Sequence, residues 1–193
     1  MSVPRLVALA ATLAVLAVPA TASAATSTFD RLEVIAPADF RNLTEVCDDG
    51  TTATSRVRIT GGHEQEAEDG VSTLDRDYLR VQIQSGCTGR IIQVTTNDAD
   101  FTWSPSLQTA SVVGTFTTAA GDKISVDVTW EGTGPIEVDS NNNSFPGRSA
   151  NFIGRQRDAV ATGTVVLNGK TLVDGLTTNA LIESLDDHIV ETT

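Results

Sequence analysis

Residues 123–131 read KISVDVTWE, and the apolar side chains of this stretch fall on every second position. The apolar set is Ile124, Val126, Val128 and Trp130. Because successive side chains of a β-strand point to opposite faces of a sheet, this period of two predicts a strand with one dry and one wet face. The face that carries Trp130 must point into the protein interior, which is either a filled core or a pocket.

The same alternation recurs along most of the chain. Short β-rich runs occupy residues 56–60, 78–84, 90–96, 111–117, 124–130, 159–167 and 170–173, and residues 179–185 and 188–192 are expected to form a last pair of strands around Asp186 and Asp187. We therefore predict an all-β protein, a single antiparallel β-barrel or β-sandwich of about 8–10 strands. The alternative is a β-sandwich with a short N-terminal helix. Residues 29–43 are the one stretch that could form a short helix or an irregular edge strand, and Pro37 limits either.

The segment that precedes Lys123 predicts a hairpin. With Ala120–Asp122 as a three-residue loop, Phe116 faces Val126 across the hairpin. A two-residue loop would place Phe116 opposite Asp127, so the apolar pattern favours the three-residue loop.

A second hairpin is predicted at Asn168–Gly169, which lies between apolar flanks. An Asn-Gly pair suits the two-residue turns that connect antiparallel strands. This turn places Val165 opposite Leu172.

The first 24 residues, MSVPRLVALAATLAVLAVPATASA, combine an early Arg, an apolar run and a small-residue ending. These are the parts of a secretory signal peptide, and Ala22 and Ala24 predict cleavage after Ala24. We expect a secreted protein whose mature chain, residues 25–193, is a single all-β domain. The apolar run is short for a membrane span and no later one follows, so no membrane span is expected in the mature chain.

The mature chain is strongly acidic. Loss of Arg5 with the signal peptide leaves 12 basic residues against 25 acidic ones. A field of this sign repels phosphate at long range, so we expect no nucleic-acid partner.

Cys47 and Cys87 are the two cysteines of the chain. In an oxidising compartment they predict one disulfide, which closes a loop of about 40 residues and contributes on the order of 3–4 kcal/mol. The alternative is a catalytic or metal-binding thiol, although neither cysteine has a His or a second Cys close by in sequence.

The segments VDVTWEGTGP (126–135) and GRQRDAVATGTV (154–165) resemble a group of small exported actinobacterial β-domain proteins of unassigned function. In that group a Thr-Trp-x-Gly-Thr-Gly-Pro turn precedes a strand rich in Arg, Ala and Thr. The resemblance covers about the last third of the chain. It implies a soluble secreted β-domain and carries no catalytic residue across.

Motifs for metal or cofactor chemistry are scarce. His63 begins HEQEAED (63–69), which lacks the second His of a zinc-binding helix and is predicted to be a solvated acidic loop, with a hard cation as the alternative. Residues 139–144, DSNNNS, have three ligand spacings of a calcium loop but lack its Gly and Glu, and are predicted to be a polar turn. We expect no cofactor and no metal.

A possible ligand site comes from residues 154–167, GRQRDAVATGTVVL. One face of this strand carries Arg155, Arg157, Ala159, Ala161, Gly163, Val165 and Leu167. Its small middle residues lie between an apolar end and two guanidinium groups, as in a barrel mouth that binds a small anionic ligand. The hypothesis adds Arg148 from the preceding loop, with Trp130 and Phe116 along the apolar part. The alternative is that the arginines pair with acidic residues at a sheet end or, if a bulge lies near Asp158, turn outward.

These observations favour a secreted binding or surface-interaction module over an enzyme, and a small anionic ligand is the candidate for what it binds. A small secreted hydrolase that uses two carboxylates is one alternative, since Asp98, Asp100, Asp127, Asp139 and Asp158 offer many pairs. A purely structural envelope protein is another. The oligomeric state is not predicted.

Overall fold

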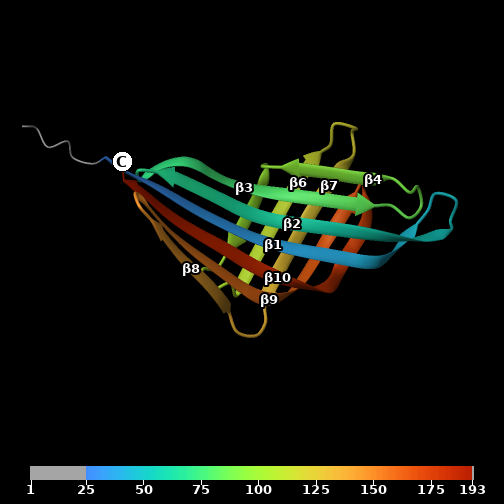
Figure 1. The fold of residues 1–193 in the computed structure, drawn as a ribbon. Coiled ribbons are helices and arrows are strands. Elements are labelled where there is room, and N and C mark those ends of the chain that lie inside the picture. Colours follow the sequence, from blue (N-terminus) through green and yellow to red (C-terminus); the bar gives the residue numbers. More distant parts are fainter. Residues whose placement is uncertain (1–24, 193) are drawn as a thin grey trace, which may run out of the picture.

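The computed structural model describes residues 25–192, which form strands and connecting turns (Figure 1). The predicted signal peptide, residues 1–24, lies outside the described residues. The strands are β1 (Thr26–Val46), β2 (Thr52–Glu68), β3 (Val71–Gln84), β4 (Ile91–Thr96), β5 (Ala99–Trp103), β6 (Thr109–Thr117), β7 (Lys123–Gly132), β8 (Glu137–Phe145), β9 (Arg148–Leu167) and β10 (Lys170–Thr192). No helix in this part of the chain is long and apolar enough to cross a membrane.

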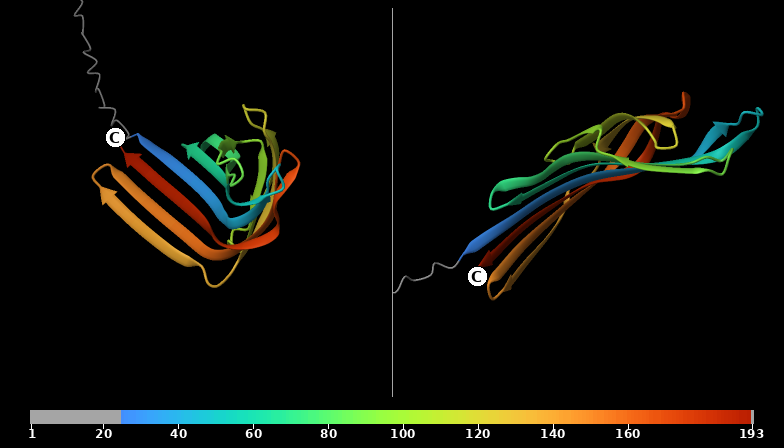
Figure 2. Two further views of the ribbon diagram at one scale, coloured as in Figure 1. Left: turned by 90° about the vertical axis from the view of Figure 1, so that its right-hand side faces the viewer. Right: turned by 90° about the horizontal axis from the view of Figure 1, so that it is seen from above.

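All ten strands belong to one antiparallel sheet, ordered β4-β3-β2-β1-β10-β9-β7-β6-β5, with β8 paired beside β9. The sheet curls into a half-barrel (Figure 2). This confirms the predicted all-β, barrel-like fold. Residues 26–35, 137–156 and 183–192 extend from the half-barrel as a single layer, which we call the arm (Figure 1).

The core fills the inside of the curl. Trp130 is completely buried, and its cross-strand neighbours Ala110 and Ala161 are small enough to leave room for the indole ring. A Cβ at Gly163 would lie 2.5 Å from Cγ2 of Val128, so that side chain occupies the space above this glycine. At this level the interior is therefore packed rather than hollow.

Strands β3 and β5 are not paired through their backbones, and side chains link them instead. Asp77 on β3 accepts a hydrogen bond from the N–H of Phe101 on β5 at 3.2 Å. The other oxygen of Asp77 lies 2.8 Å from Nδ1 of His63, and the ring of Trp103 packs on His63 with the centroids 4.6 Å apart. The Asp77 carboxylate thus links three strands.

The Cys47–Cys87 disulfide is present, with an S–S distance of 2.01 Å. It joins the connection between β1 and β2 to the connection between β3 and β4. The prediction of one intramolecular disulfide is confirmed.

Residues 29–43 belong to β1, so the helical alternative was wrong. Val34, Ala36, Ala38 and Phe40 are buried on alternate positions. Pro37 lies between Ile35↔Glu183 and Ala38↔Ala180, the last two pairs that β1 makes with β10. Because proline has no N–H to donate, it interrupts this ladder without ending the strand.

Three loops predicted in the sequence are instead strand. HEQEAED at 63–69 lies largely in β2, DSNNNS at 139–144 lies in β8, and the predicted break at Asp186–Asp187 lies inside β10. For β2 the reason is cross-strand charge pairing. Glu64 accepts hydrogen bonds from Arg76 on β3 at 2.7 Å and from Arg31 on β1 at 3.2 Å, which stabilises an acidic strand in the middle of a sheet.

The register of the first predicted hairpin was also wrong, by two residues. Phe116 faces Ile124 instead of Val126, because the loop runs from Thr118 to Asp122. Thr118 and Asp122 close this loop with a backbone hydrogen bond of 2.8 Å, and Arg90 holds the Asp122 carboxylate at 2.7 Å.

The turn at Asn168–Gly169 is confirmed, but Val165 faces Val173 instead of Leu172. A register shift between Thr171 and Val173 makes Leu172 the extra residue of a β-bulge.

Candidate functional site

The seam between β1 and β10 is paired over only part of the length of the two strands. The two strands pair from Thr26↔Thr192 to Ala38↔Ala180 and then part, β1 continuing along β2 and β10 along β9. Register shifts in β10, and another in β1 between Phe40 and Leu43, accompany the separation. Bulges bend the strand that carries them, so they explain why the two strands diverge.

The diverging strands enclose a hollow of about 970 Å³, which we call the fork. It is lined by Asp39, Phe40, Arg41, Asn42, Leu43, Thr44, Thr171, Leu172, Asp174, Leu176, Thr177, Thr178 and Asn179. Phe40 and Leu43 are buried at its floor, whereas Leu176 keeps 47% of its surface exposed. The fork therefore combines an apolar floor with hydroxyl and amide groups and with the charged side chains of Asp39, Arg41 and Asp174.

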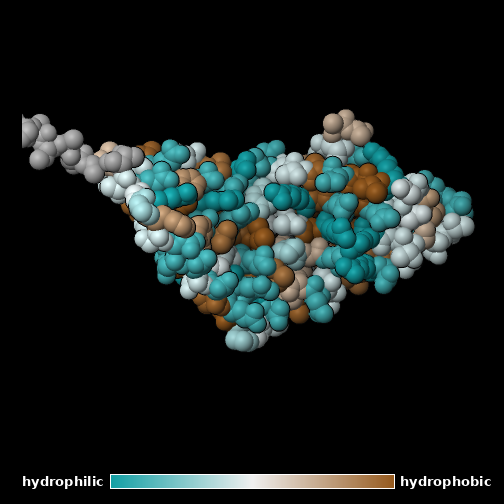
Figure 3. Space-filling model, viewed as in Figure 1, coloured by the Kyte–Doolittle hydropathy of each residue, from teal (hydrophilic) through white to brown (hydrophobic). Residues whose placement is uncertain are grey.

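Two further hollows continue the fork along the seam. Asp39 and Asn179 line both the fork and the next hollow, of about 470 Å³, which also contains Pro37 and Leu181. Two residues farther along each strand, Ile35 and Glu183 line a third hollow, of about 570 Å³, on the arm. We call this succession of hollows the seam groove. Figure 3 shows the outer face of the sheet, where hydrophobic residues interrupt a mostly hydrophilic surface.

The arm end of the seam groove is acidic. Four carboxylates line it, from Glu33 (β1), Glu137 and Asp139 (β8) and Glu183 (β10), around Ile35 and Leu185. Within residues 25–192, only Glu33 of these four carboxylates forms an ion pair, with Arg31 at 2.9 Å. The other three are available to a cationic ligand.

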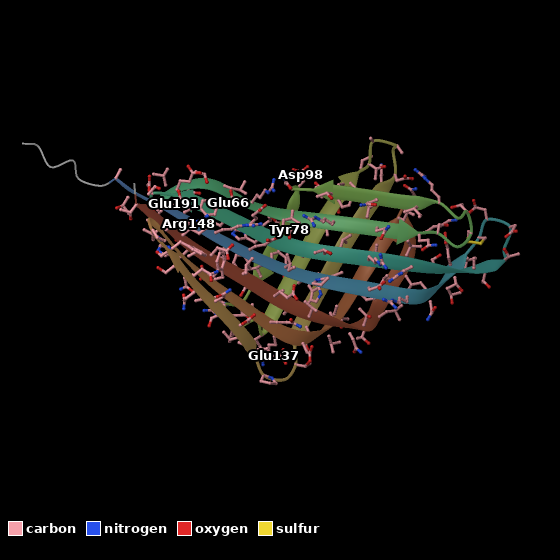
Figure 4. All side chains as sticks on the ribbon, viewed as in Figure 1. Glu66, Tyr78, Asp98, Glu137, Arg148 and Glu191 are labelled. Atoms are coloured by element: carbon pink, nitrogen blue, oxygen red, sulfur yellow. A yellow bond between two sulfur atoms is a disulfide. The ribbon has the colours of Figure 1, made fainter. Side chains whose placement is uncertain are left out.

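Glu33 is held in place by a tyrosine that crosses β2. A Cβ at Gly62 would lie 2.3 Å from the Tyr78 ring, so only glycine lets the ring lie over this strand. The Tyr78 hydroxyl donates to Glu33 at 3.4 Å, and burial together with the Glu33 charge raises the pKa of Tyr78 to about 12. Figure 4 shows Tyr78 and Glu66 on the strands beside the arm.

Asp187 is a buried acid on this face. It lies opposite Arg31 on β1, and its Oδ1 atom has no hydrogen-bond partner among the described residues. Burial raises the pKa of Asp187, against the opposing effect of the Arg31 charge.

The five residues of the predicted anion site do not line one cavity. Trp130 lies in the core and donates its indole N–H to the carbonyl of Pro37 at 3.0 Å. Phe116 is partly buried and pairs with Ile124, six residues along β7 from Trp130. The predicted apolar lining is therefore divided between separate parts of the core.

The three arginines are also separated. Arg157 donates to the carbonyl of Ser106 at 3.2 Å and covers Gly132, while Arg148 lies 3.4 Å from Glu191 at the end of the arm (Figure 4). Arg155 contributes to the arm hollow. Its neighbours Gly154 and Gln156 share the face of the carboxylates, so strand alternation directs the Arg155 side chain to the other face.

The described residues contain no group of three or more His, Cys, Asp or Glu side chains that could hold a metal ion. His63 and Asp77 form a close pair, but both are occupied by the β3–β5 junction described above. His188 lies 2.5 Å from Asp30 on the arm.

Sequence reasoning missed the seam groove. Its residues come from β1, β2, β8, β9 and β10, and the two strands that form the seam, β1 and β10, meet through pairs separated by more than a hundred residues in the chain. Asn42 and Gly175 lie at irregular points of β1 and β10 and have positive φ angles of 55° and 59°. Asn and Gly are the residue types that adopt this conformation most readily, so they are a weak local indication of these irregularities.

Comparisons of this chain with protein-family models, with curated proteins and with solved structures found no match.

Proposed function

We propose that the protein is a binding module that accepts an extended, basic segment of polypeptide in the seam groove. The observation that carries this proposal is the fork, where β1 and β10 part after Ala38↔Ala180 and their edges face each other across an open hollow. Unpaired strand edges present main-chain donors and acceptors, which an extended peptide complements.

The shape of the groove supports an extended ligand. The hollows follow two strands from Thr44 on β1 to Glu33 on the arm, a span of 12 residues. At about 3.3 Å per residue this corresponds to roughly 35–40 Å. Apolar side chains along it, such as Leu176 and Leu185, suit alternate side chains of a bound strand.

The charge of the groove supports a basic ligand. Four carboxylates line the arm end, and among the described residues only Glu33 of these four is paired, with Arg31, while the whole chain has a formal charge of −12. Such a field attracts cationic segments and accelerates their association. It disfavours the small anionic ligand expected from the sequence.

A direct test uses labelled ten-residue peptides and fluorescence anisotropy. A peptide of alternating lysine and valine should bind, whereas one of alternating glutamate and valine should not. A lysine-proline peptide of equal charge should bind more weakly, because proline cannot donate main-chain hydrogen bonds. Equal binding of all three peptides would contradict the proposal.

Two variants locate the site. Glu137→Gln with Glu183→Gln should weaken binding about five- to thirtyfold, at roughly 0.5–1 kcal/mol per lost ion pair. Leu176→Asn tests the fork, and Glu131→Gln, on β7 outside the groove, is the matched control that should leave affinity unchanged. Hydrogen exchange should show protection of amides in residues 40–44 and 174–178 on binding, and no protection there would place the peptide elsewhere.

A further inference from the structure

Strand β8 is a long free edge of the sheet. Its nine residues pair with β9 alone, from Glu137↔Gln156 to Phe145↔Arg148, without a register shift. Every one of them is exposed, and β8 lies at the outer border of the arm (Figure 1). Its second edge therefore presents a regular row of main-chain N–H and C=O groups.

The other edges in the described sheet are shorter or less regular. The outer side of β3 has no strand partner over residues 71–78, but this segment carries Asp75, Arg76 and Asp77 and pairs with β2 across a register shift between Glu66 and Ala67. Strands β4 and β5 have only six and five residues, and the Asp77 carboxylate ties β5 to β3. The facing edges of β1 and β10 are interrupted by register shifts. Short strands, bulges, Pro and charged side chains, Lys above all, are the devices by which proteins prevent edge pairing. The β8 sequence EVDSNNNSF has no Lys, Pro or bulge, and its two charges, Glu137 and Asp139, lie within its first three residues.

A second copy of β8 is a complementary partner for this edge. In an antiparallel pair centred on Asn141, that residue faces its own copy, Asp139 faces Asn143 and Glu137 faces Phe145. No carboxylate lies directly opposite another, which removes the main cost of pairing two acidic chains. The facing Asn side chains each supply donors and an acceptor, so they can bond across the pair.

We propose that two copies of this chain associate through antiparallel β8–β8 pairing, which joins their arms into one continuous sheet. The arrangement is a two-fold symmetric contact, in which the same surface serves both copies. The Ser and Asn residues in the middle of β8 carry no charge that would select a different partner.

Sedimentation velocity of the purified protein at about 100 µM tests the proposal and should show a dimer. The dissociation constant of the dimer should fall between 0.15 M and 0.5 M NaCl, because salt screens the repulsion between the acidic chains. Asn141→Lys places two lysines face to face and should give a monomer with an unchanged melting temperature. Thr129→Lys, an equal charge change at an exposed position of β7, should remain dimeric. A monomeric wild type at both salt concentrations would overturn the proposal, as would a dimer that persists in Asn141→Lys.

Cross-linking gives a second readout that does not depend on destabilising the pair. Asn141→Cys places two thiols across the symmetry axis and should form an intermolecular disulfide under mild oxidation. Thr129→Cys should not cross-link. Equal cross-linking of the two variants would show that β8 does not meet its copy.

Discussion

Replacing Trp130 by alanine tests whether the buried face of β7 packs against a filled core. The side chain is 0% exposed, and burying a tryptophan removes about 150–250 Å² from water. At about 25 cal/mol per Å² this area corresponds to on the order of 4–6 kcal/mol. Because alanine retains a little of the burial and the neighbours relax in part, we expect the free energy of unfolding to fall by about 3–5 kcal/mol.

The variant Trp130→Phe separates the apolar ring from its polar N–H group. Phenylalanine keeps most of the buried surface but cannot donate to the carbonyl of Pro37, which the indole nitrogen reaches at 3.0 Å. Leaving a buried acceptor without its donor costs about 1–3 kcal/mol. The phenylalanine variant should therefore lie between the wild type and the alanine variant.

Urea unfolding with the disulfide intact, followed by far-ultraviolet circular dichroism, measures both losses, provided that the three proteins share one m-value. Fluorescence is less suitable, since Trp130 is one of only two tryptophans. The control is Val113→Ala on the neighbouring β6, where the side chain is 49% exposed and the change should stay within about 0.5 kcal/mol. A loss below about 1.5 kcal/mol for Trp130→Ala would mean that the ring borders a cavity and that the interior is not packed at this level.

Two further predictions concern the disulfide and acid stability. Replacing Cys47 and Cys87 by serine removes a cross-link between residues 40 positions apart, and the free energy of unfolding should fall by roughly 4 kcal/mol in the chain-entropy model; equal urea midpoints with and without the bridge would contradict this. The hydrogen bond from Arg56, the largest cause, lowers the pKa of Asp39 from 3.8 to about 2, so Asp39 stabilises the fold above its unfolded pKa and loses this effect as the pH falls through about 2. Because Asp39 and its arginine partners are partly exposed, solvent screening reduces the contribution to about 1 kcal/mol. Asp39→Asn should flatten the fall in stability between pH 4 and pH 2; parallel curves for the two proteins would refute the assignment.

The all-β class and the location of most strands could be predicted from the sequence, because the signal is local. Alternation along residues 124–130 places the apolar side chains of β7 in the core, as the structure shows. The single disulfide could equally be predicted from two cysteines in a chain whose first 24 residues have the pattern of an export signal. The acidic run at 63–69, by contrast, was predicted as a loop, because its strand structure depends on charge pairing of Glu64 with Arg31 and Arg76 on the two neighbouring strands.

The candidate site could not be predicted, because it arises where strands from the two ends of the chain meet and part. Alternation predicted that Arg155 and Arg157 share a face, but it could not show that β7 ends at Gly132 or that Arg157 covers that residue. Nor could it reveal the bulges that separate β1 from β10. A bulge adds one residue on one strand, and no local pattern distinguishes that strand from a regular one.

The sequence by itself determined which face of each regular strand is buried, and the tertiary structure decided which residues pair across the sheet. The hairpin of β6 and β7 shows the physical reason. A shift of two residues leaves every side chain on its own face, so the hydrophobic pattern fits Phe116 opposite Val126 as well as opposite Ile124. The choice is made by Asp122, whose carboxylate is held by Arg90 and Asn168 from distant parts of the chain.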